Sequence, residues 1–190
     1  MNKSFFLLAT ALFALSGCLG GRTTTITLPE QTQAPSDIPR QIQYRGETYR
    51  LQGRNETQAE YYREGEQGYQ WKKLITLHKQ TGTVPLGTFA GVMTQQLKHE
   101  HARYEIVPKK NALQVTVVYL PKKGHPHFKD HEVNLMHYRQ SPCGFTGLQY
   151  AERHAAGSDA GKLLAAGKRA QTQFQTYAAD LLSRIDCPVK

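Results

Sequence analysis

The sequence lacks a long hydrophobic run and a recognisable catalytic motif, and each absence narrows the function classes open to it. Its apolar run at 5–15 is shorter than the roughly 20 residues that a membrane-spanning helix needs. The chain has no GxSxG elbow, phosphate-binding glycine loop, HExxH helix or paired-carboxylate pattern. We therefore expect a protein that is not an enzyme and holds no cofactor, with an enzyme of unrecognised site as an alternative.

The first 18 residues form a short export signal. Lys3 gives a positive start, the apolar run follows, and Leu15-Ser16-Gly17-Cys18 places small residues before a cysteine. This pattern resembles the lipobox of bacterial lipoproteins. The resemblance implies that residues 1–17 are a signal peptide, cleaved before Cys18. An ordinary secretory signal that ends in cysteine is the alternative.

The lipobox resemblance also implies a location. Cys18 would carry thioether-linked diacylglycerol and, in many Gram-negative bacteria, a third chain such as palmitate on its amino group. At about 0.8 kcal/mol per buried methylene, two or three chains hold a protein on a membrane essentially permanently. In the family an aspartate after the cysteine commonly retains the protein at the inner membrane. Leu19 occupies that position here and favours the outer membrane, with the periplasmic or surface side left open.

Composition and patterning divide the remaining chain into a tether and one domain. Removal of residues 1–17 takes away one lysine and no acid, which leaves 23 basic against 15 acidic residues and a net charge of +8. Residues 18–40 are rich in Thr, Gln, Pro and Gly, and their 22 residues after Cys18 would span about 25 Å as a flexible coil. Residues 41–190 are long enough for a single domain with its own core.

Two cysteines remain once Cys18 carries lipid. Cys143 and Cys187 are an even pair in an oxidising compartment, so we predict a disulfide between them. On the chain-entropy model, a bridge closing this loop contributes about 4 kcal/mol. The alternative is that Cys143 is a nucleophilic thiol served by a base such as His154, which would require Cys143 to be free.

Alternating and β-branched segments predict an antiparallel sheet. Ile42, Tyr44, Tyr49 and Leu51 flank a turn at 45–47, which is typical of a short hairpin. Further strand signals lie at 71–78, 104–106, 114–120, 133–138 and 145–150. Because no helical crossover separates most of them, we expect antiparallel pairing. The stretch 55–69 is polar, glycine-punctuated and without a strand signal.

Two segments repeat apolar residues at helical spacing. The first predicts a helix at about 86–100, through Leu86, Phe89, Ala90, Met93 and Leu97. A second stripe ending at Ile185 predicts a helix at about 159–185, capped by Ser158 or Asp159. The predicted fold class is α+β, an antiparallel β-sheet with both helices packed on one face.

A short segment carries a further resemblance. The run from Glu60 to Glu66, followed by Trp71, Leu74, Ile75 and Thr76, resembles the opening of small secreted bacterial proteins of unknown function. The resemblance implies a strand led by a buried tryptophan and carries no activity.

Histidines in the segment 124–132 give a metal-binding alternative. His125, His127 and His131 are two to six positions apart, and imidazole suits Zn(II) or Cu(II). A metal-binding lipoprotein would use these three ligands. A solvated hairpin loop is the simpler interpretation, since the spacing matches no established ligand pattern.

The basic charge favours anionic partners. Lysine pairs at 109–110 and 122–123, with Lys129, could attract an anionic glycan or lipid. We do not expect nucleic acid as a ligand, because aromatic residues do not interleave with the charges as a stacking platform requires.

Tyrosines in the first part of the domain suggest a partner surface. Tyr61, Tyr62 and Tyr69 lie in a polar stretch, and tyrosine is favoured at interfaces. The hypothesis is therefore a membrane-anchored envelope lipoprotein that acts as a non-catalytic binding or assembly module for a protein or an anionic envelope component.

Overall fold

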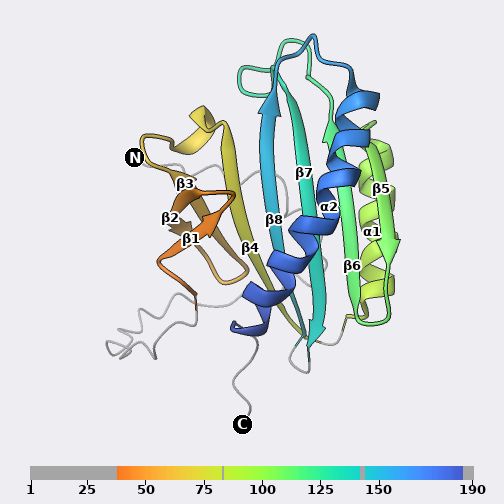
Figure 1. Ribbon diagram of the computed structural model, residues 1–190. Helices are drawn as coiled ribbons and strands as arrows, with labels where there is room; N and C mark the ends of the chain where they lie inside the picture. The colour runs from red at the N-terminus through yellow and green to blue at the C-terminus, as the bar shows by residue number, and fades with distance from the viewer. Residues whose placement is uncertain (1–37, 83, 142–143, 186–190) are drawn as a thin grey trace, which may run out of the picture. The chain divides into compact units, whose positions relative to one another are not determined.

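The domain is one antiparallel sheet with an α-helix on each side (Figure 1). The computed structural model describes residues 38–82, 84–141 and 144–185. The strands are β1 (Gln41–Tyr44), β2 (Glu47–Arg54), β3 (Gln58–Arg63), β4 (Lys73–Thr81), β5 (Arg103–Pro108), β6 (Ala112–Tyr119), β7 (His131–Ser141) and β8 (Gly144–His154). Their order across the sheet is β1-β2-β3-β4-β8-β7-β6-β5, and every neighbouring pair is antiparallel. The predicted α+β class with an antiparallel sheet is confirmed.

The predicted helices also form. They are α1 (Leu86–His99) and α2 (Ala160–Ser183), and a short 3-10 helix, η2 (Gly68–Gln70), precedes β4. Asp159 caps α2, because its side chain accepts a hydrogen bond of 2.9 Å from the backbone N–H of Lys162. Within the described ranges, no helix is long and apolar enough to cross a membrane.

The β1–β2 hairpin is a direct product of its sequence. Arg45 and Gly46 form the two-residue turn with φ of 51° and 76°, as a type I′ turn requires. The hairpin packs against the C-terminal half of α2, where Tyr44 lies 5.7 Å from Phe174 and 4.9 Å from Tyr177 between ring centroids. The first two strands and the last helix, far apart in sequence, therefore share one core.

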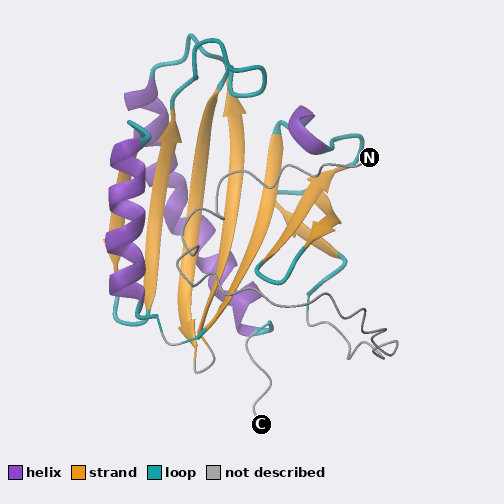
Figure 2. Ribbon diagram, turned by 180° about the vertical axis from the view of Figure 1, so that it is seen from behind, coloured by secondary structure: helices purple, strands orange, loops and turns teal. Residues whose placement is uncertain are grey.

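The two helices lie on opposite faces of the sheet, so the prediction that they share one face is wrong. On β6, Thr116 hydrogen-bonds to Gln171 of α2, whereas Val115 and Val117 pack in the cluster that contains α1. Neighbouring residues of a strand point to opposite faces. Figure 1 accordingly shows α2 in front of the sheet, and Figure 2, turned by 180°, shows α1.

The α1 side contains a close approach between two strands and a helix. The ring of Tyr138 on β7 lies against Gly147 on β8, and a Cβ added at Gly147 would be 2.2 Å from that ring. Phe89 of α1 also contacts the tyrosine edge to face, with ring centroids 4.9 Å apart. Glycine at this position lets α1 reach the sheet.

Four predicted features lie outside the described residues. These are lipidation at Cys18, the signal peptide, most of the tether, and the bridge between Cys143 and Cys187. All four stay predictions.

Gly147→Ala is expected to destabilise the fold by about 1–3 kcal/mol, because the methyl group overlaps a buried ring that Phe89 keeps from moving. Gly91→Ala is the matched control, since this helical glycine has open space around it. Alanine there should raise the free energy of unfolding by up to about 1 kcal/mol. Urea unfolding of the two variants should give changes of opposite sign. Equal stability of Gly147→Ala and the unchanged protein would contradict the packing described.

Candidate functional site

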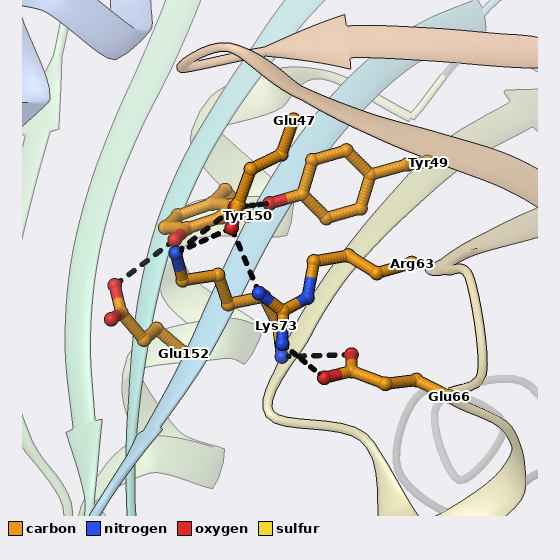
Figure 3. Close-up of polar contacts among 7 residues, drawn as sticks. All are labelled: Glu47, Tyr49, Arg63, Glu66, Lys73, Tyr150 and Glu152. Atoms are coloured by element: carbon orange, nitrogen blue, oxygen red, sulfur yellow. Dashed lines mark hydrogen bonds and ion pairs between the residues drawn. The ribbon is translucent and has the colours of Figure 1, made fainter.

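A network of charged side chains joins four parts of the sheet on the α2 side. We call it the carboxylate network, and Figure 3 shows its members. They are Glu47 and Tyr49 of β2, Arg63 of β3, Glu66 in the following loop, Lys73 of β4, and Tyr150 and Glu152 of β8. Four of these residues lie in the first part of the domain, where the tyrosines suggested a partner surface.

Glu47 is the centre of the network. One carboxylate oxygen accepts a hydrogen bond of 2.8 Å from Arg63, the other accepts one of 2.9 Å from the Tyr49 hydroxyl, and Lys73 donates to both oxygens at 3.0 and 2.9 Å. Arg63 also donates to Glu66. The β2, β3 and β4 strands are thereby tied together through one carboxylate.

Electrostatics favour the ionised form of this carboxylate. Burial of Glu47 opposes its ionisation, but the hydrogen bonds from Lys73, Arg63 and Tyr49 outweigh burial and lower its pKa to about 2. The hydrogen bonds of Arg63 with Glu66 and with Glu47 raise the pKa of Arg63 above its ordinary value. A carboxylate held this strongly is a poor proton donor or acceptor near neutral pH, so we assign the network a structural role.

The opposite face of the sheet carries a second polar feature, which we call the amide row. It crosses four strands through Gln58 of β3, His78 of β4, Gln149 of β8, and Asn134 and Glu132 of β7. Consecutive members are 3.4, 3.1, 2.6 and 3.0 Å apart between hydrogen-bonded atoms. On this face the row runs between the apolar cluster under α1 and a smaller cluster of Tyr62, Trp71, Leu74 and Ala151.

Every hydrogen bond of the amide row points the same way. Asn134 donates to the Glu132 carboxylate, and Gln149 donates to the Asn134 carbonyl oxygen, so the Gln149 oxygen must face His78 Nε2. His78 therefore carries its proton on Nε2 and accepts from Gln58 on Nδ1. Burial keeps the ring neutral and lowers the pKa of His78 to about 4, although the contact with Gln149 acts in the opposite direction.

The row ends at the carboxyl group of Glu132, whose pKa is raised, whereas that of His78 is lowered. Burial raises the pKa of Glu132, while Asn134 and Arg153 lower it. Perturbed acids and bases are a feature of active sites, yet structural networks shift pKa values too. Two amides separate His78 from Glu132, so the two groups do not act on one reacting atom.

Two loops meet beside Glu132 and form the third feature, the aromatic corner. It consists of Tyr69 and Trp71 near η2, His127 and Phe128 in the β6–β7 loop, and Arg153 of β8. Tyr69 stacks on His127 with ring centroids 4.1 Å apart and an interplanar angle of 5°. Arg153 lies 4.1 Å over the Trp71 ring and donates a hydrogen bond of 2.6 Å to the Tyr69 carbonyl oxygen.

The structure separates the three tyrosines predicted to bind a partner. Tyr61 is fully buried in the core shared with α2, and Tyr62 is 7% exposed with its hydroxyl bonded to Glu60. The expectation that these two side chains are available at the surface is wrong, because β3 turns Tyr61 into the core and Tyr62 toward Trp71. Tyr69 is half-buried at the aromatic corner and keeps its candidacy.

The three histidines predicted to bind metal do not converge. The rings of His125 and His127 are 6.0 Å apart between centroids, and His127 is stacked on Tyr69. His125 turns its Nδ1 to the backbone N–H groups of His127 and Phe128. His131 is buried at the start of β7. Across the described ranges, no three His, Cys, Asp or Glu side chains are grouped to hold a metal ion.

Comparison with known proteins adds one relationship. A model of an uncharacterised family matches residues 36–181. No curated protein matches the chain.

Glu47→Gln is expected to lower the free energy of unfolding by about 1–2 kcal/mol at neutral pH, because it weakens charge-assisted hydrogen bonds that are only partly exposed to water. The folded-state pKa of about 2 lies below the unfolded value, so this stabilisation is complete above about pH 4.5 and is lost as the pH falls toward 2. Thermal unfolding across this range measures the difference. Glu56→Gln, at an exposed turn position, is the control, and a pH-independent difference would contradict the assignment.

In the amide row, the His78 ring is expected to titrate near pH 4 by NMR. Gln149→Leu should lower this pKa further, because it removes a hydrogen bond that favours the protonated ring. The exposed Gln173→Leu is the control and should leave the titration unchanged. A rise of the His78 pKa in Gln149→Leu would be incompatible with the tautomer assigned.

Proposed function

The chain belongs to the uncharacterised family whose model covers residues 36–181, and from that premise we propose that it is a membrane-anchored envelope lipoprotein whose domain is a non-catalytic binding or assembly module. The lipid at Cys18 supplies location at the outer membrane, and the domain recruits a protein partner.

The anchor rests on the sequence. Leu15-Ser16-Gly17-Cys18 follows a positive start and a short apolar run, as in bacterial lipoproteins. Acylation would keep the domain at one membrane, since two acyl chains are an effectively permanent anchor.

The aromatic corner is the observation that carries the binding role. Tyr69 is half-buried and His127 is exposed, so their stacked rings present a rigid edge to solvent. Tyr, Trp and Arg are enriched at protein interfaces because they give large contact area with little conformational entropy to lose. Here Arg153 and Trp71 support the exposed pair from below, through the contact and the hydrogen bond already described.

The aromatic corner suits a protein partner better than a small molecule. The corner joins two loops that are nearly sixty positions apart in sequence, and it offers the stacked faces of Tyr69 and His127 for contact. A flat aromatic and cationic surface suits a protein face with apolar and acidic groups.

The experiment combines the two parts of the proposal in one preparation from intact cells. Cells receive an alkyne-tagged palmitate, and a photo-cross-linking amino acid replaces the exposed Gln70 beside Tyr69. Capture through the acyl tag should recover the protein joined to one partner protein after irradiation. Tyr69→Ser should keep the tag and weaken partner binding about five- to thirtyfold, because loss of a stacked interface aromatic costs on the order of 1–2 kcal/mol.

Matched controls separate the two failures. Cys18→Ser should abolish the tag and Cys143→Ser should retain it; a tag that survives Cys18→Ser would overturn the anchor. The photo-cross-linker in place of Gln173, exposed on α2, should give no adduct. Equal adducts at positions 70 and 173 would mean that contact is random and would overturn the binding surface.

A further inference from the structure

The β6–β7 loop forms an open basic hollow of about 550 Å³. We call it the loop hollow, and its lining residues are Pro121, Lys122, Lys123, Gly124, His125, Pro126 and Lys129. Three of the seven are lysines, and none of the lining residues is acidic. The sequence-based metal hypothesis placed ligands in this segment, but its geometry serves a different kind of ligand.

The loop holds its shape through its own hydrogen bonds. The backbone N–H of Lys122 donates to the Phe128 carbonyl oxygen at 2.7 Å, and that of His125 donates to the Lys122 carbonyl oxygen at 3.1 Å. Gly124 has φ of 78°, which a type II turn requires at its third position. Contacts of His127 and Phe128 with Tyr69 fix the loop from outside. The hollow is thus built before a ligand arrives.

The orientation of His125 makes its free nitrogen a donor. Nδ1 accepts hydrogen bonds from the backbone N–H groups of His127 and Phe128 at 3.2 and 3.3 Å. A neutral imidazole that accepts on Nδ1 carries its proton on Nε2. His125 therefore adds an N–H donor to the hollow, as the lysines do.

Two of the three lysines have charge that is not neutralised locally. Lys122 pairs with Glu100 at 2.9 Å and lies 5.5 Å from the Phe128 ring centroid. Lys123 and Lys129 are exposed, and in the part of the chain that the structure describes neither has a carboxylate partner. The lining residues therefore offer positive charge and N–H donors, and the one carboxylate bonded to them, Glu100, is paired with Lys122.

We propose that the loop hollow binds the phosphate of an anionic lipid headgroup at a membrane surface. Phosphate presents several acceptor oxygens and negative charge, which match ammonium groups and an imidazole N–H. In an open site, solvent and salt weaken the binding of a single free phosphate. A membrane presents many phosphates at once, and each lysine near its surface adds to the binding free energy. The inference deepens the proposed function by naming a ligand, and it leaves the protein-binding surface at the aromatic corner unchanged.

The test uses the full chain with Cys18→Ser, so that no acyl chain contributes and failure of the anchor is a separate result. Flotation with vesicles compares phosphatidylcholine alone with phosphatidylcholine containing phosphatidylglycerol. We expect a preference for the anionic vesicles that Lys123→Ala/Lys129→Ala weakens about 30-fold, since each lysine near an anionic surface adds about fivefold. Inorganic phosphate should release the protein more effectively than chloride at equal ionic strength.

The control is Lys109→Ala/Lys110→Ala, which removes the same charge from the exposed turn at the other end of β6. This variant should keep the preference. An equal loss in both double variants, or equal release by chloride and phosphate, would identify diffuse attraction and overturn the site. Binding of inorganic phosphate without a vesicle preference would overturn the assignment to a lipid.

Discussion

Burial of β6, β7 and β8 on both faces is the constraint on which the rest of this structure depends. Helix α2 covers these strands on one side. On the other side, where α1 and the amide row lie, most of their side chains are also buried. A buried polar group without a partner costs free energy, which favours polar side chains on these strands that find partners in the sheet or on α2. Gln114 and Thr116 do so with α2, and Asn134 does so with Gln149 and Glu132.

Much of this fold was predictable from the sequence because its strongest patterns are local. The β1–β2 turn, the strand signals from β4 onward and both helices follow from alternation, β-branching and helical spacing. The helix bounds differ little from those predicted, whereas β7 and β8 extend well beyond the predicted 133–138 and 145–150. The side of the sheet that each helix covers was not predictable from either stripe alone. In sequence β6 resembles a strand covered on one face, because Gln114 and Thr116 alternate with apolar residues, yet the structure buries 113–118 continuously.

The sites were harder to predict, because each is assembled from distant strands. Strand β3 was missed because its alternation of polar and apolar residues covers only Gln58 to Tyr61, and its tyrosines suggested a surface that Tyr61 does not provide. Glu47, Arg63 and Lys73 meet only through strand pairing, so no spacing in the sequence reveals them. The histidine loop was identified as a binding candidate, but ring orientation, set by hydrogen bonds within the loop, favours an anion over a metal ion.

The shared direction of the hydrogen bonds in the amide row has a consequence for how this sequence can change over generations. Each of the three inner members, His78, Gln149 and Asn134, accepts a hydrogen bond from one neighbour and donates one to the next. An apolar residue at one of these three positions would leave two partners without a hydrogen bond in the interior. Substitution of one inner member therefore lowers stability, whereas joint replacement of the whole row by apolar residues leaves no polar group without a partner. These five positions should be inherited as a unit, and descendants should either keep the complete row or replace it entirely with apolar packing.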